Sequence, residues 1–252
     1  MLKVGDVSPF LPSIVASPAR LLPQSFRGAY LQSMDIEDLT LNAGYLDRIN
    51  RRDSSNYQAM TVASPNRRFN PAAESSHAAF FGGDYQLSKG LKLRAYHTTV
   101  ADLYRQEYFG LLHELPVGPG VLSTDLRAFI SNEDGSAKAG KVDNRNLAAQ
   151  FAYSFDGHRF TLGYMHQSGE TAKPYISGTE SMVISEMAMS SDFLNPKERT
   201  WQAIYDYDFA AAGVPGLKTR LRYLRGDNIE LPTLGGADLK AVSYTHLTLP
   251  TT

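Results

Sequence analysis

The feature that most constrains this chain is a strict alternation of apolar and polar residues on both sides of a tight turn. In the segment Glu198–Asn228, Trp201 begins an apolar series at every second position, and Arg222 belongs to a charged series beyond the turn Gly213-Val214-Pro215-Gly216. Alternation with a period of two around a Gly/Pro turn predicts a β-hairpin. Its apolar face must either be covered by a second sheet or contact lipid in a transmembrane barrel.

The same alternation recurs along most of the chain. Short turns such as Gly118-Pro119-Gly120 alternate with longer polar links, for which we take Tyr104–Glu107 and Ser131–Asn144 as examples. Short turns at one end and long loops at the other are typical of outer-membrane barrels. We predict eleven strands: Leu2–Gly5, Phe26–Met34, Leu39–Arg48, His77–Leu87, Leu91–Leu103, Tyr108–Leu115, Val121–Ile130, Asn146–Phe155, Arg159–Gln167, Trp201–Phe209 and Leu217–Tyr223.

The composition and the lengths of the apolar stretches argue against several other classes of protein. No stretch approaches the ~18 consecutive apolar residues of a membrane-spanning helix. Lys and Arg number 25 against 26 Asp and Glu, which argues against a general nucleic-acid binder. The absence of Cys excludes a disulfide scaffold and thiol catalysis. The chain is therefore expected to depend on its strand pattern for its fold.

Motifs for catalysis or cofactor binding are missing or incomplete. The segment Gly135–Val142 approaches a phosphate-binding loop, but Val142 stands where Ser or Thr would meet Mg²⁺, and a strand rather than a helix follows. The six His residues have no second ligand at metal-binding spacing. We therefore predict that the protein is not an enzyme and needs no cofactor.

Nine short segments lie in order along the chain: Leu2–Asp6, Arg20–Leu31, Leu39–Arg48, Arg52–Asn56, Phe81–Tyr85, Asp102–Tyr108, Asp134–Arg145, Tyr205–Leu217 and Arg222–Asn228. Together they resemble the OprD family of outer-membrane porins. The resemblance implies an all-β fold, an antiparallel up-and-down transmembrane β-barrel, here incomplete, with about eleven strands of an eighteen-stranded family barrel. It also implies a place in the bacterial outer membrane.

The two ends of the chain depart from the family pattern. Met1 leads straight into a predicted strand without the charged and apolar regions of a signal peptide, so we expect an N-terminus cut inside a longer protein. The segment Ala241–Thr252, AVSYTHLTLPTT, is similar to a translated sequencing adapter. We thus expect a partial barrel over residues 1–240 and a non-native tail over 241–252; a genuine Thr-rich strand is the alternative for the tail.

A row of basic residues occupies strand positions that alternate with the apolar positions. If the apolar side chains face lipid, these basic side chains face the lumen of the barrel. Charged rows in a pore select solutes of opposite charge through their field. Solvated surface charges with no such role are the alternative. The predicted row consists of Lys92, Arg94, Arg127, Arg159, Lys218, Arg220 and Arg222.

The resemblance adds two loop residues to this row. Family members are similar in a basic ladder that leads carboxylates past an acidic residue on an inward loop. On that basis we expect the loops Val7–Gln24 and Ser168–Lys197 to fold inward, the first carrying Arg20 and the second Asp192. From the residues alone, both side chains could equally be exposed loop charges.

The resulting functional prediction is passive, substrate-selective uptake of small carboxylate-bearing solutes, such as amino acids and aromatic or other organic acids. Outer-membrane lipid is the other expected partner, nucleic acid is not, and association of full-length protomers stays open. Two alternatives remain. One is a soluble all-β binding or adhesion module. The other is a fragment without independent activity, because an open barrel leaves two unpaired edges in lipid.

Overall fold

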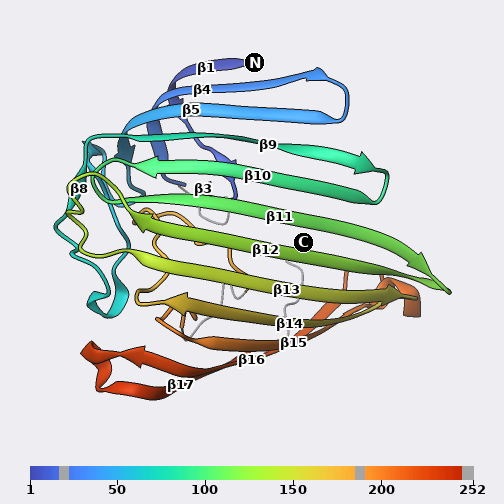
Figure 1. Cartoon of the computed structure of the whole chain (residues 1–252). Helices are drawn as coiled ribbons and strands as arrows, with labels where there is room; N and C mark the ends of the chain where they lie inside the picture. The colour runs from blue at the N-terminus through green and yellow to red at the C-terminus, as the bar shows by residue number, and fades with distance from the viewer. Residues whose placement is uncertain (17–22, 185–190, 246–252) are drawn as a thin grey trace.

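The chain folds into one long, curved, antiparallel sheet whose strands follow the order of the sequence (Figure 1). The computed structural model describes residues 1–16, 23–184 and 191–245. Along the main path each strand is hydrogen-bonded to the next, and β6 (Tyr57–Gln58) pairs beside β5. The strands of this path are β1 (Leu2–Val7), β4 (Ser25–Ile36), β5 (Leu39–Asn50), β9 (Ala78–Ser88), β10 (Leu91–Val100), β11 (Tyr104–Val117), β12 (Gly120–Glu133), β13 (Asp143–Phe155), β14 (His158–Gly169), β15 (Arg199–Asp208), β16 (Lys218–Leu231) and β17 (Gly236–Thr245).

This topology confirms the predicted all-β, up-and-down meander, and all eleven predicted strands are present. The path also contains a twelfth strand, β17, which takes in residues 241–245 of the predicted tail and pairs with β16. Residues 246–252 lie outside the described residues, and the non-native origin of the tail stays a prediction. Within the described residues β1 and β17 do not pair, so the sheet there is open.

One predicted link is wrong. The segment Tyr104–Glu107 begins β11 and pairs in register with β10 and β12. Tyr104 and Gln106 are buried on one face, while Arg105 and Glu107 point to the other. At this end of β11 the outward residues are charged rather than apolar, so the sequence shows no alternation of apolar and polar residues there.

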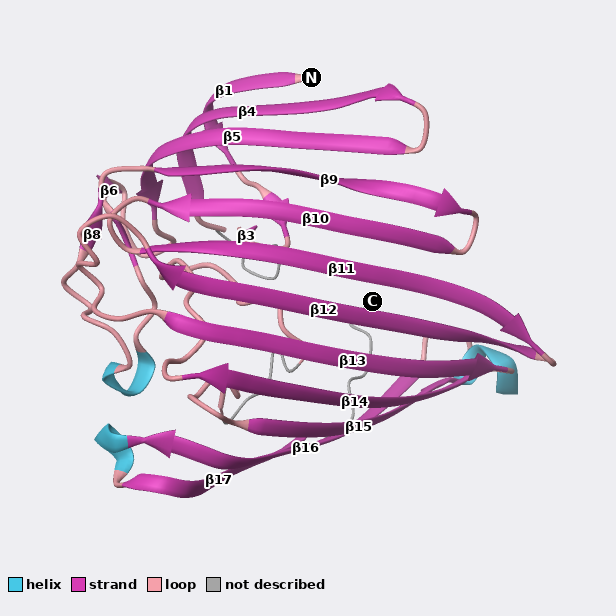
Figure 2. Cartoon of the chain, viewed as in Figure 1, coloured by secondary structure: helices cyan, strands magenta, loops and turns pink. Residues whose placement is uncertain are grey.

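The two ends of the sheet differ in their connections (Figures 1 and 2). At one end, the turn end, most links are tight, and the link at 209–217 is the longest. Asp156 and Gly157 have φ of 44° and 76°, the left-handed pair that a type I′ hairpin turn requires. At the other, the loop end, the connections at 8–24, 51–77, 134–142 and 170–198 are long, whereas those at 101–103 and 232–235 are short. The predicted alternation of short and long links therefore holds in most places but is not strict.

The two faces of the sheet also differ. Large apolar side chains are exposed on the outer face: Leu162 is 67% exposed, Trp201 57% and Leu147 51%. In the described residues the remaining sheets are only the two-stranded pairs β2 (Phe10–Leu11)–β3 (Ile14–Val15) and β7 (Met60–Thr61)–β8 (Glu74–Ser75), which cannot cover this face. An uncovered apolar face of this extent indicates contact with lipid or a partner. It argues against the soluble alternative.

The core lies on the opposite, inner face near the loop end. Ile14, Met60, Phe129 and Phe193 are fully buried there, and they come from three loops and one strand. Short 3₁₀ turns occur at η1 (Pro65–Arg67), η2 (Phe209–Ala212) and η3 (Pro232–Leu234). No helix in the described part of the chain is long and apolar enough to cross a membrane.

Candidate functional site

The inner face of the sheet is the face against which the long loops pack. The hydroxyl oxygens of Thr98 on β10 and Ser13, between β2 and β3, are 2.5 Å apart in a buried contact. Gln106 on β11 donates from Nε2 to the carbonyl oxygen of Pro174 at 3.2 Å. Since side chains alternate between faces along a strand, residues with the parity of Thr98 and Gln106 line one enclosed side of the curved sheet.

The described parts of both loops expected to fold inward lie on this side. In the first loop, Ile14 and Val15 of β3 are buried. In the second, the carbonyl oxygen of Met182 accepts a bond of 2.7 Å from Arg127 on β12. The loops also touch each other, because the amide of Glu180 donates to the carbonyl oxygen of Val15 at 3.2 Å. Two joined loops therefore narrow the enclosed side near the loop end.

All seven basic residues of the predicted row have the inward parity, but four of them are paired with carboxylates on the wall. Their nearest nitrogen–oxygen distances range from 2.5 to 3.0 Å. The inner wall is consequently a series of ion pairs rather than an uninterrupted basic row. The pairs are Arg94–Asp84, Arg127–Asp125, Lys218–Asp208 and Arg220–Asp206.

The other three cations of the row have different surroundings. Arg159 donates to the hydroxyl of Ser154 at 3.0 Å. Arg222 donates from Nη2 to the side-chain oxygen of Gln202 at 3.0 Å and to the carbonyl oxygen of Ile184 at 3.1 Å. Lys92 has no side-chain hydrogen bond or ion pair with another residue in the described ranges. A neutral acceptor does not cancel the charge of a guanidinium, so Arg159 keeps a positive field toward the lumen.

Asp192, the predicted acidic residue of the second loop, has a partner that the sequence did not indicate. Arg68, in the loop after β5, forms two parallel bonds with it, of 2.6 and 2.8 Å. The side chain of Arg68 is only 3% exposed, and that of Asp192 is 24% exposed. This bidentate pair ties two long loops together at the loop end. The predicted Arg20 lies outside the described residues.

A buried carboxylate beside this pair was also missed. Glu198, just before β15, accepts bonds from the amide and side chain of Asn195, and its Oε1 has no hydrogen-bond partner. Burial, with a smaller contribution from Asp192, raises the pKa of Glu198 to about 7. A Cβ atom at Gly226 would lie 2.1 Å from that oxygen, so a larger residue there would require the Glu198 side chain to shift.

Lys173, in the second loop, is the other charged residue that sequence reasoning missed. It is 1% exposed. Its Nζ donates to the carbonyl oxygen of Ser181 at 2.8 Å and lies 4.0 Å from the ring centroid of Phe129 on β12. This cation–π contact fixes the loop against the sheet. A lone Lys in a polar loop gives no sequence signal for such burial.

Polar side chains also join neighbouring strands of the inner wall. Asn42 on β5 donates to the hydroxyl oxygen of Tyr96 at 3.0 Å, and that hydroxyl donates to Asp84 at 2.9 Å. Asp84 thus receives bonds from both Tyr96 and Arg94. On the other side, Gln202 donates to Gln150 and accepts from Arg222. In the residues that the structure describes, no cluster of three or more His, Cys, Asp or Glu could hold a metal ion.

A meander with a bare apolar outer face and a charged inner face narrowed by loops defines the wall of a membrane channel. The comparisons with known proteins agree with this class. A family model described as "outer membrane porin, OprD family" matches residues 1–245. The chain belongs to this family and is therefore a protein of the bacterial outer membrane.

Curated and solved relatives support the assignment. The chain is 31% identical over 238 residues to the porin-like protein GalP of Pseudomonas putida, covering 94% of this chain and 57% of GalP. It is 33% identical over 241 residues to Porin D of Pseudomonas aeruginosa, covering 91% of this chain and 53% of Porin D. The chain thus spans about half the length of the curated relatives that it matches.

Solved structures extend the likeness to three dimensions. OccAB2 of Acinetobacter baumannii superposes with a TM-score of 0.92 at 42% identity, covering 97% of this chain and 62% of that one. OccK5 (OpdH) of P. aeruginosa superposes with a TM-score of 0.89 at 38% identity, covering 95% and 64%. These matches cover most of this chain and part of each relative, which agrees with the predicted incomplete barrel.

Proposed function

We propose that this chain forms part of the wall of a closed outer-membrane porin through which small carboxylate-bearing solutes diffuse passively and selectively. The chain covers little more than half of its curated relatives, so the closed barrel, its activity and its solutes are parts of this proposal. The open edges of β1 and β17 would pair with further strands, because unpaired edges are not tolerated in lipid.

The observation that carries the proposal is that two arginines hold the same inward loop from separated strands. Arg127 on β12 binds the carbonyl oxygen of Met182, and Arg222 on β16 binds that of Ile184. The loop therefore crosses the enclosed side between these strands, with a guanidinium at each anchor. A solute that passes this loop meets two guanidinium groups, of which that of Arg127 is also ion-paired with Asp125.

The mechanism needs no bond to be made or broken. The field of fixed charges within a narrow, low-dielectric passage raises the local concentration of oppositely charged solutes. A carboxylate can exchange between the guanidinium groups along this passage, because a guanidinium fork matches a carboxylate and gives charge-assisted bonds. Each exchange is reversible, so the solute moves down its gradient.

One relative gives chemical support for the solute class. OpdK of P. aeruginosa, at 32% identity and a TM-score of 0.88, was solved with vanillate, a carboxylate. For this chain we propose the broader class of small carboxylates. The guanidinium groups of Arg127 and Arg222 support a negatively charged solute.

The test is liposome swelling with the full-length porin that carries this chain. A carboxylated solute is compared with its decarboxylated counterpart of the same size. We expect faster entry of the carboxylate, and Arg222→Ala should lower that preference roughly threefold to tenfold because it removes a charge at the loop. Arg222→Lys keeps the charge but loses the fork, so its effect should be smaller.

Arg105→Ala is the matched control, since Arg105 lies on the outer face of β11. It should leave the preference unchanged. Equal entry of both solutes into liposomes with the unaltered porin would indicate a general porin, and the arginines would then have no selective role. No entry of either solute would contradict a channel function.

A further inference from the structure

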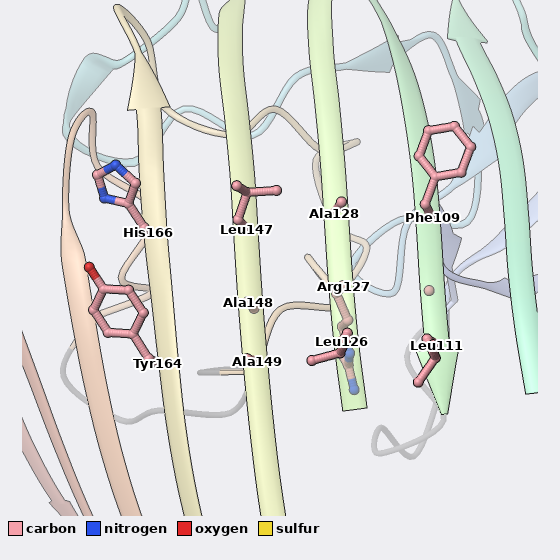
Figure 3. Close-up of a pocket in the computed structure, with 11 residues that line it drawn as sticks. Phe109, Leu111, Leu126, Arg127, Ala128, Leu147, Ala148, Ala149, Tyr164 and His166 are labelled. Carbon is pink, nitrogen blue, oxygen red and sulfur yellow. The ribbon is translucent and has the colours of Figure 1, made fainter. Parts of the chain in front are cut away.

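A groove crosses the outer face of the sheet over β11, β12, β13 and β14 (Figure 3). It has a volume of about 560 Å³. Small residues form its floor, notably Ala128 and Ala149. The larger side chains that wall it are Phe109, Leu111, Leu126, Leu147 and Tyr164.

The strand register explains this shape. One cross-strand row runs Phe109–Ala128–Leu147–His166, and the next row toward the turn end runs Leu111–Leu126–Ala149–Tyr164. The two alanines stand diagonally on neighbouring strands, so a hollow runs between the larger side chains around them. Figure 3 shows these two rows as two levels of side chains.

The loop-end side of the groove is polar and basic. His166 closes it, and its Nδ1 is buried without a hydrogen-bond partner among the described residues. Arg145 lies one row nearer the loop end, opposite Ser168, and its side chain is exposed and makes no ion pair or hydrogen bond within the described ranges. Arg199 is paired in register with His166 on the other side and forms an ion pair with Asp227 at 3.3 Å, so Arg145 is the arginine of this end that has no carboxylate partner in the described ranges.

Aromatic side chains indicate where the membrane surface lies. The rings of Tyr164 and Trp201 are 4.4 Å apart, one row closer to the turn end than His166 and Arg199. Tyr and Trp on the outer face of a barrel gather at the boundary between hydrocarbon and headgroups. Arg145, His166 and Arg199 therefore stand at headgroup level, and the groove lies at the boundary between the headgroups and the hydrocarbon.

We propose that this groove binds an acyl chain of a phosphate-bearing lipid of the outer leaflet, whose phosphate is held by Arg145, His166 and Arg199. The surrounding lipid tails are as apolar as the groove, so apolar contact alone gives little preference. The basic end supplies the preference, because arginine forms bidentate, charge-assisted bonds with phosphate. The site is independent of the solute that passes through the pore.

Charge also distinguishes this occupant from a second copy of the chain. A symmetric contact through the groove would bring the same basic end of each copy toward the same patch of its partner. Like charges would then meet at headgroup level. A phosphate-bearing lipid instead matches both the apolar groove and the cations at its end.

Native mass spectrometry of the full-length porin in a non-ionic detergent tests the proposal. The probes are a bis-phosphorylated lipid A and its dephosphorylated form with the same acyl chains. We expect the phosphorylated form to be retained about tenfold better. The double substitution Arg145→Ala and His166→Ala should remove most of that preference. Ala149→Trp fills the groove without touching the basic residues, and it should weaken retention of both probes.

Lys89→Ala is the matched control, because Lys89 is an exposed cation in the turn between β9 and β10, at the opposite end of the sheet. It should leave lipid retention unchanged. Circular dichroism and thermal unfolding establish that each variant is folded. Equal retention of the two probes, or full retention by the double variant, would overturn the proposal. A dimer that excludes lipid would assign the groove to a second copy instead.

Discussion

Charged side chains lie at both ends of the inner wall, but they are held in different ways. At the turn end, Arg220 pairs with Asp206 and is 54% exposed. At the loop end, Arg68 pairs with Asp192 and is 3% exposed, with the buried Glu198 close by. Access to water decides what each pair does. Exposed pairs are screened and can exchange partners with a solute, whereas a buried charge that loses its partner is left uncompensated. The loop end should therefore be rigid and the turn end adaptable.

The largest effect is expected from Arg68→Ala. It leaves Asp192 without its two bonds, so the free energy of local opening for the segment 191–198 should fall by about 3 kcal/mol. Hydrogen exchange at the amides of Asn195 and Glu198 measures this opening. Arg68→Lys should give an intermediate value, because lysine lacks the fork. Unchanged exchange in Arg68→Ala would remove the contrast between the two ends of the wall.

A pH-dependent effect is expected from Glu198. The pKa of this carboxyl is about 7 when the loop is docked, against an ordinary value of 4.5. A raised pKa means that the Glu198 carboxyl binds a proton more tightly when the loop is docked than when it is open. The contribution of Glu198 to docking is thus fully present below pH 4.5 and is lost as the pH rises toward 7. The groups that face it are Asp192, Arg68 and Asn195.

Hydrogen exchange of the segment 191–198, corrected for intrinsic chemistry, should accordingly show easier opening as the pH increases from 4.5 to about 7. Glu198→Gln should remove this dependence, since the amide does not titrate. If the substituted protein kept the same pH profile, another group would be responsible. Asp206→Asn, at the turn end, is the control and should leave the profile unchanged.

The smallest effect on stability is expected from Arg220→Ala. The pair with Asp206 is exposed on the arginine side, so the change in unfolding free energy should be only about 0–1 kcal/mol. A urea titration followed by circular dichroism measures it, and 1 M salt should abolish what difference there is. A loss as large as that expected for Arg68→Ala would show that the turn end is not adaptable.

The fold could be predicted largely because alternation with a period of two is a direct consequence of strand geometry. All eleven predicted strands exist, and the hairpin around Gly213 and Gly216 is formed by β15 and β16. Errors arose where the outer positions leave the hydrocarbon. Around Arg105 and Glu107, polar outer residues alternate with polar or aromatic inner residues. The sequence there shows no contrast between apolar and polar positions.

The site was predictable only in part. The alternation along each strand predicted that the basic row points inward, because the face to which a side chain points can be read from its own strand alone. Three of the four carboxylate partners depend on register between strands, as in Arg220 opposite Asp206, whereas Asp125 lies on the same strand as Arg127. The bond between Arg68 and Asp192 spans 124 positions of sequence, and the burial of Lys173 depends on how a loop folds back. Neither leaves a local pattern that a single sequence can reveal.

The anchors of the second loop have a consequence for evolution. Arg127 and Arg222 donate hydrogen bonds to the main-chain carbonyl oxygens of Met182 and Ile184, and every amino acid has this group. Substitutions at these two positions can therefore alter the chemistry presented to a solute while the attachment of the loop is preserved. In the proposed porin, a lineage that keeps the two arginines can acquire new permeants through point mutations in the loop, while the attachment of the loop stays the same.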